Sequence, residues 1–149
     1  MKKTDEQTVR LASFLPYRIN NLAKRISDSL AMTYAERFNV SIPEWRVIAV
    51  LGENSAITSK TISHITLMDK TKVSRAVSDL LEKGVVKKQT LQSDGRAFNL
   101  SLSAKGKKLY RQISTLALSW EESFIECLDS TEKKAFLKTI EKLEAHLDL

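Results

Sequence analysis

Six hydrogen-bonding side chains occupy one short stretch of the chain. They are Lys70, Thr71, Lys72, Ser74, Arg75 and Ser78. The guanidinium of Arg75 presents a planar fork of donors that fits the two acceptors on the major-groove edge of a guanine. The two lysines lie in the first turn of a predicted helix, where they are placed to meet phosphates, and a helix N-terminus favours the same anions. The chemistry of this stretch therefore suits double-stranded DNA.

An apolar face opposes these polar side chains. Val73, Val77 and the pair Leu80–Leu81 recur at helical spacing, which predicts an amphipathic helix. An ordinary solvated helix surface carries similar charges, so this helix alone leaves both interpretations open.

A predicted β-hairpin follows the helix. Residues Val85–Thr90 form one expected strand, and Phe98–Leu102 alternates apolar with polar residues, as a half-buried second strand does. The expected turn between them, residues 93–96, contains no apolar residue.

The hairpin carries its own charges. Arg96, at the turn, is expected to enter the minor groove beside the recognition helix, and Lys87 and Lys88 add positive charge along the first strand. The alternative is a plain surface hairpin in which Asp94 and Arg96 pair with each other. Such exposed pairs contribute less than about 1 kcal/mol, so stability alone is a weak reason for them.

Capping residues divide the preceding segment into two short helices. Thr58 is the predicted N-cap of a helix that runs through Ile65, and Asp69 is the N-cap of the next, which Gly84 ends in a left-handed conformation. A tight turn at Leu67–Met68 joins them. Two short helices in this order predict a helix-turn-helix, whose second helix normally enters the major groove.

Longer helices are expected on both sides of this unit. The first has an apolar stripe with Pro16 in its first turn, and the stripe comprises Leu11, Leu15, Ile19, Leu22, Ile26 and Leu30. A second helix starts at a capping box, Ser41 with Glu44, with Pro43 in its first turn, and ends near Gly52.

After the hairpin, Ser103 caps a long helix whose stripe comprises Leu109, Ile113, Leu116, Trp120, Phe124 and Cys127. Asp129 or Ser130 caps a last one.

Charge and composition narrow the class of protein. Residues 60–111 contain 12 Lys and Arg against 4 Asp and Glu, whereas the rest of the chain contains 12 against 14. A single basic block suits a polyanion, although a solvated charged face remains the alternative.

Only four glycines are present, so the sequence contains no phosphate-binding loop and an enzyme is not expected. His64 and His146 have no companions that suggest a metal site, and no cofactor is expected.

The expected location is the cytoplasm, with no membrane partner. No apolar run approaches the roughly 20 residues that span a bilayer, and the N-terminus lacks the apolar core of a signal peptide. The one cysteine, Cys127, cannot form an intrachain disulfide. Its position on an apolar stripe predicts a buried, inert thiol rather than a redox sensor.

Two runs of sequence resemble the MarR (multiple antibiotic resistance regulator) family. The run MDKTKVSRAVSDLLEKGVV, residues 68–86, resembles the family's recognition helix leading into its wing, and Ile57–Ile65 resembles the helix before it. The run DGRAFNLSLSAKG, residues 94–106, is similar to the family's wing signature, in which Asp-Arg-Arg is followed by a strand, Leu-Thr and Gly. Gly95 stands where the family often has a second arginine, so Arg96 would make the wing contact alone, with Asp94 orienting it.

The resemblance covers essentially the whole chain and implies a fold. It is mainly α with a small β-hairpin: a winged helix-turn-helix with N- and C-terminal dimerisation helices. Residues 1–149 would form a single domain, with about 1–40 and 103–149 as dimerisation helices and about 41–102 as the winged lobe. The implied function is a sequence-specific transcriptional regulator, a repressor released by a small ligand.

The apolar stripes at both ends of the chain also favour a homodimer, because one small lobe cannot cover them. Packing of both helices onto their own lobe is the alternative. A two-fold axis would place the recognition helices about 34 Å apart, as a pseudo-palindromic operator requires.

Two segments, Leu15–Arg18 and Ile42–Arg46, resemble a branch of the family that responds to aromatic carboxylic acids. The hypothesis is that Arg18 binds the carboxylate while Tyr17 and Trp45 supply aromatic walls. The alternatives are an ordinary core role for Trp45 and an interface ion pair for Arg18.

Two other kinds of partner compete with DNA. A winged helix can serve as a protein-interaction module without DNA binding, although the basic recognition face argues against it. RNA is less favoured, because no aromatic residues are interleaved with the basic residues of this face.

Overall fold

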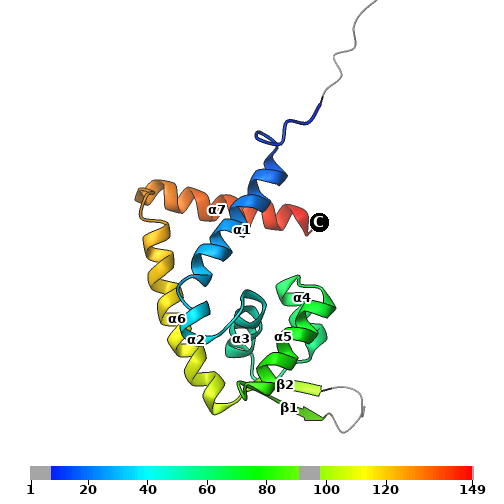
Figure 1. The fold of residues 1–149 in the computed structure, drawn as a ribbon. Coiled ribbons are helices and arrows are strands. Elements are labelled where there is room, and N and C mark those ends of the chain that lie inside the picture. Colours follow the sequence, from blue (N-terminus) through cyan, green and yellow to red (C-terminus); the bar gives the residue numbers. More distant parts are fainter. Residues whose placement is uncertain (1–7, 91–97, 149) are drawn as a thin grey trace, which may run out of the picture. The chain divides into compact units, whose positions relative to one another are not determined.

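The computed structural model describes residues 8–90 and 98–148, which are mostly helical with one two-stranded antiparallel hairpin (Figure 1). The helices in chain order are α1 (Leu15–Ala31), α2 (Ala35–Phe38), α3 (Ile42–Glu53), α4 (Ser59–Thr66), α5 (Lys70–Glu82), α6 (Ala104–Phe124) and α7 (Ser130–Leu147), and the strands are β1 (Val86–Thr90) and β2 (Phe98–Leu102). The fold class expected from the sequence is confirmed. The chain divides into two compact units, Met1–Tyr110 and Arg111–Leu149.

Side-chain caps start the helices where the sequence predicts them. Ser41 and Glu44 form the predicted capping box of α3. Thr58 Oγ1 accepts a hydrogen bond from Thr61 N at 3.3 Å, and Asp69 Oδ1 accepts one from Lys72 N at 2.8 Å. Because each cap satisfies amide hydrogens that have no partner within the helix, α3, α4 and α5 begin at defined residues.

Left-handed residues end α4 and α5. Leu67 closes α4 with a φ of 55°, and Gly84 follows α5 with a φ of 70°. Glycine adopts this conformation at no steric cost, whereas leucine does so against a penalty. Leu67 is held by its neighbour Met68, whose buried side chain and carbonyl oxygen, bonded to Ser63 Oγ at 2.6 Å, fix the turn between the two helices.

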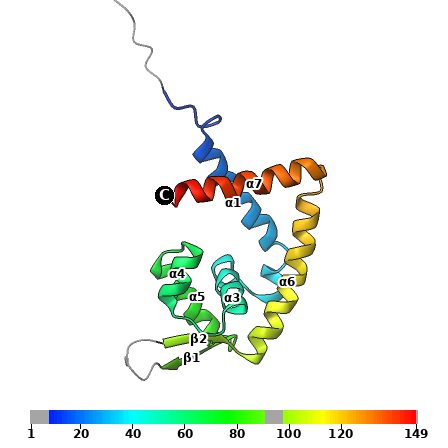
Figure 2. The ribbon, with the colours of Figure 1, turned by 180° about the vertical axis from the view of Figure 1, so that it is seen from behind.

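The core of the first unit lies where α3, α4, α5 and the hairpin meet (Figures 1 and 2). Its most completely buried members include Val47 and Ile48 of α3, Ile62 of α4, and Val73 and Leu80 of α5. The hairpin adds inward-facing residues at alternate positions of β2, Leu100 and Leu102. The apolar face of α5 is therefore anchored on both neighbouring helices.

The hairpin pairs in one register, with Val86 opposite Leu102 and Thr90 opposite Phe98. Ile57, which precedes α4, extends the sheet by one bridge. Its amide donates to Leu100 O at 3.1 Å, and Leu100 N donates back to Ile57 O at 2.8 Å. The wing is thus tied to the start of the helix-turn-helix.

A close approach joins the hairpin to the start of α6. Ser103 Oγ donates to Gly84 O at 2.7 Å and accepts from Gly106 N at 3.0 Å. A Cβ added at Gly106 would lie 2.1 Å from Val85 O. Only a residue without a side chain therefore lets α6 begin so near the first strand.

The structure corrects two expectations and adds one short helix. Leu11 lies in a turn before α1 and not in that helix, because α1 begins only at Leu15, with Pro16 in its first turn. The short helix α2 separates α1 from α3 and was not predicted. Cys127 lies after the end of α6 and is exposed, so the predicted buried position on the α6 stripe is wrong.

The second unit consists of the remainder of α6 and of α7. Trp120 and Phe124 stack at 4.9 Å near the end of α6. Asp129 forms a capping box with Glu132 at the start of α7, as one of the two predicted caps. Large apolar residues of α7 remain exposed, and they are Phe136, Leu137, Ile140, Leu143 and Leu147.

The Gly106→Ala variant tests the close approach. In an ordinary helix this change stabilises the protein by about 0.5–1 kcal/mol. Here the new methyl would clash with Val85 O, so we expect a loss of about 1–3 kcal/mol in the free energy of unfolding. Urea unfolding followed by circular dichroism measures it, with Gln112→Ala at an exposed α6 position as the control. A stabilised Gly106→Ala protein would show that the approach is looser than described.

Candidate nucleic-acid interface

The helix α5 has two faces of opposite character. Val73, Ala76, Val77 and Leu80 are buried against the rest of the first unit. The six polar residues singled out from the sequence are all exposed, and they are Lys70, Thr71, Lys72, Ser74, Arg75 and Ser78. The structure thus brings these six residues together on the outward side of one helix.

The basic residues of this face have no acidic partner within residues 8–90 and 98–148. The ion pairs there are Lys24 with Asp28 and Lys83 with Glu44. Lys70, Lys72 and Arg75 therefore present positive charge that no carboxylate of the described chain neutralises. A polyanion would gain most from such a face, because each contact releases a counterion.

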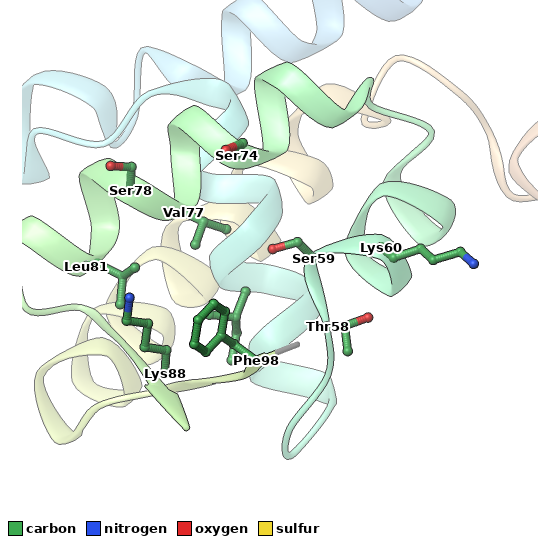
Figure 3. A pocket seen from close by; sticks show the side chains of 10 residues that line it. Thr58, Ser59, Lys60, Ser74, Val77, Ser78, Leu81, Lys88 and Phe98 are labelled. Carbon is green, nitrogen blue, oxygen red and sulfur yellow. The ribbon is translucent and has the colours of Figure 1, made fainter. Parts of the chain in front are cut away.

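A hollow of about 500 Å³ lies between α4, α5 and the hairpin (Figure 3). Apolar groups line its inner wall, including Val77, Leu81 and Phe98. Hydroxyl and ammonium groups also line it, and they are Thr58, Ser59, Lys60, Ser74, Ser78 and Lys88. Side chains from α4, α5 and the hairpin thus line one depression beside the exposed face of α5.

The hairpin contributes Lys88 to this hollow. Its Nζ lies 4.8 Å from the ring centroid of Phe98, a cation–π distance. Figure 3 shows the two side chains together below α5. Lys87, the neighbouring strand residue, is also exposed. Asp94 and Arg96 of the expected turn lie outside the described residues.

The sequence-based selection missed Thr58, Ser59 and Lys60. Thr58 was assigned only to capping, and Lys60 was counted in the basic block without a position. Their place beside Ser74 and Lys88 depends on how α4 packs on α5 and on the Ile57–Leu100 bridge. The basic block was the one signal in the sequence that pointed to Lys60.

The three residues of the ligand hypothesis are distributed over two places. Tyr17 and Arg18 line a hollow of about 520 Å³ along α1, together with Leu15, Leu22 and Arg25. Both side chains are exposed, with Tyr17 at 42%.

Trp45 is not among the residues that line this hollow. Its ring lies 5.8 Å from that of Tyr34 and stacks on that of Tyr110 at 6.3 Å.

Tyr34 is the buried member of this aromatic group, with 1% of its surface exposed. Burial raises the pKa of the Tyr34 phenol to about 12, and the positive charge of Arg46 opposes the rise. The phenol is thus neutral throughout the physiological range.

The described part of the chain contains neither a membrane-spanning helix nor a cluster of metal-ligating residues. Residues 8–90 and 98–148 include no helix that is both long and apolar enough to cross a bilayer. They also contain no group of three or more His, Cys, Asp or Glu residues placed to hold a metal ion.

A helix-turn-helix followed by a paired hairpin, with an exposed basic face on the second helix, defines a winged-helix DNA-binding protein. A sequence model of the MarR family matches residues 38–97 of the chain. The transcriptional regulator BilQ of Clostridium symbiosum is 25% identical over 104 residues, which cover 67% of this chain and 72% of BilQ. The chain is thus similar to transcriptional regulators of the MarR family.

Solved structures are similar to the chain in fold. A MarR/EmrR family regulator from Acinetobacter sp. ADP1 is 28% identical, with a TM-score of 0.82 over 94% of this chain and 99% of its own. The BpsR protein of Bordetella bronchiseptica shares the fold at 15% identity, with a TM-score of 0.79 over 87% of this chain and 98% of its own. Regulation of BpsR's DNA binding by 6-hydroxynicotinic acid is described with that structure.

Titration of the tyrosines tests the environment of Tyr34. The chain has three tyrosines, and we expect one phenol to ionise near pH 12 in the folded protein. The unfolded chain loses that proton near pH 10. The protonated Tyr34 phenol therefore contributes fully to the free energy of unfolding below pH 10, and this contribution is lost as the pH rises toward 12. Phenolate absorbance measures the titration, and Tyr34→Phe should lack the late step. A late step that persists in Tyr34→Phe would assign the shift to another tyrosine.

Proposed function

We propose that this protein is a homodimeric repressor that binds a pseudo-palindromic operator and is released by a small aromatic carboxylic acid. One observation carries the proposal for DNA: the exposed, unneutralised basic face of α5, whose opposite face is locked into the core. A helix held in this way can enter a major groove without unfolding the lobe.

The contacts divide by chemistry. Arg75 donates two hydrogen bonds to one guanine, and neighbouring base edges bind the hydroxyls of Thr71, Ser74 and Ser78. Lys70 and Lys72 hold phosphates at the start of α5.

The hollow beside α5 receives the adjoining sugar–phosphate backbone, with Lys60 and Lys88 on either side of it. Lys87 adds charge to the wing, and Arg96, oriented by Asp94, is its minor-groove contact.

The dimer is proposed from apolar surface that the single chain leaves exposed. On α1 and just before it, Leu11, Leu15, Ile19 and Leu22 are 45–58% exposed, and α7 carries a similar set. Contiguous apolar surface of this kind marks an interaction site. We assign about residues 1–40 and 103–149 to dimerisation and about 41–102 to the DNA-binding lobe.

The test starts with selection of duplexes from a randomised library by the wild-type protein, followed by fluorescence anisotropy on the selected duplex. We expect recovery of a two-fold sequence bound by two chains. Arg75→Ala should lower the preference for the selected duplex by about 1–3 kcal/mol, because the guanine fork is lost.

The matched control is Arg37→Ala, which removes an exposed arginine of α2. It should leave the preference unchanged. Enrichment of no sequence by the wild-type protein would reject the regulator and favour a winged-helix protein-interaction module. An equal loss in both variants would mean that Arg75 contributes only charge.

The effector site is proposed on α1. Arg18 and Arg25 line the same hollow as Tyr17, so the hollow offers two arginines and one aromatic residue. A carboxylate favours bidentate pairing with arginine, and the ring suits an aromatic acid. The control of BpsR by 6-hydroxynicotinic acid supports this class of ligand. Trp45 is left out of the proposed lining because it packs with Tyr34 and Tyr110.

Isothermal titration with 6-hydroxynicotinate and benzoate tests the site. Arg18→Ala should weaken binding by about 1.5–3 kcal/mol, the worth of a hydrogen bond to a charged group. Arg10→Ala, an exposed arginine that does not line the hollow, is the control. Unchanged binding by Arg18→Ala would remove Arg18 from the proposed site.

A further inference from the structure

Lys83 lies at the C-cap of α5 and makes contacts far along the chain. Its Nζ donates to Glu44 Oε1 at 2.7 Å and to Asn39 O at 2.6 Å. Its own carbonyl oxygen accepts from Lys105 Nζ at 2.7 Å. The end of α5 is therefore fastened to the residue after α2, to α3 and to α6.

Glu44 is the buried centre of this arrangement, with 3% of its surface exposed. Its Oε2 accepts from Ser41 N at 2.7 Å, while Oε1 accepts from Lys83. Both carboxylate oxygens are thus occupied, one by the cap of its own helix and one by α5. A buried carboxylate is costly without a cation, so the arrangement favours one position of Lys83 strongly.

The contact between Lys83 and Glu44 lies at the C-terminal end of α5. The helix α5 has 13 residues, and at 1.5 Å per residue its two ends are about 20 Å apart. Its first turn is held by the Asp69 cap and the turn at Leu67. The exposed face of α5 lies between these fixed ends, and recognition requires its side chains to be held within about 0.5 Å.

We propose that Lys83 is a positioning residue for DNA recognition: held by Glu44 and the Asn39 carbonyl, it sets the angle of α5 without touching DNA itself. This inference rests on the proposed function, because it concerns how the same face meets a base edge. It separates Lys83 from Lys60, Lys70, Lys72 and Lys88, whose proposed partners are phosphates.

Two substitutions with opposite effects on charge make the test. Lys83→Met removes a positive charge, whereas Glu44→Gln removes a negative one and leaves a single acceptor oxygen for two donors. If positioning is the role, both variants lose affinity for the duplex selected by the wild-type protein. We expect about a tenfold loss, within the range for residues of one hydrogen-bonded network. Affinity for a scrambled duplex of equal length should stay within about twofold, since phosphate contacts are untouched.

The salt dependence gives a second readout. The logarithm of the affinity falls linearly with the logarithm of the salt concentration. Removal of a lysine that binds a phosphate makes this slope less steep by about 0.9. We expect an unchanged slope for Lys83→Met and a reduced slope for Lys88→Ala. The double variant Glu44→Gln/Lys83→Met should be no weaker than Lys83→Met alone, and Lys83→Arg should restore most of the affinity.

Each other outcome overturns the inference. A reduced slope in Lys83→Met with tighter binding by Glu44→Gln makes Lys83 a phosphate contact. If the two variants lose affinity equally for the selected and the scrambled duplex, or lose none for either, Lys83 does not position α5 for recognition. Circular dichroism at the assay temperature identifies a variant that does not fold. In that case Glu44→Gln, which keeps the side-chain shape, decides the question. Failure of the wild-type protein to select any sequence is a separate result that rejects the proposed function.

Discussion

Val73, Ala76, Val77 and Leu80 hold α5 against α3 and α4 through buried apolar contacts. The positions of the exposed side chains of α5 depend on this packing, because the outer face itself contributes nothing to the core. Its lysines, hydroxyls and arginine can all point to solvent only while the inner face supplies the packing. The left-handed residue Leu67, which ends α4, and the cap at Asp69 then set where α5 begins.

The local features of the fold follow from the sequence alone. Capping at Ser41, Thr58 and Asp69, the stop at Gly84 and the alternation in Phe98–Leu102 are each decided by residues within a few positions of one another. For the same reason the six polar residues of α5 were found together. The helix period fixes which side chains share a face, whatever the helix later packs against.

Features that join distant segments were not predicted. Glu44 was read as one half of a capping box, and nothing near it in sequence signals that its second oxygen binds Lys83. Trp45 was considered both for a ligand wall and for the core, and nothing near it in sequence signals its contacts with Tyr34, which precedes α2, and with Tyr110 of α6. Cys127 continued an apolar stripe that the helix itself does not follow beyond Phe124. For Glu44 and Trp45 the missing information is tertiary packing, which joins residues far apart in the sequence.

The division of α5 into an anchored side and an outward side also has an evolutionary consequence. Substitutions at Thr71, Ser74, Arg75 or Ser78 change exposed side chains, and surface changes of this kind usually alter stability by less than about 0.5 kcal/mol. After a gene duplication, one copy can therefore acquire a new target sequence by drift on these positions while its fold stays intact. The same scaffold can thus diverge into many regulators whose cores remain nearly interchangeable.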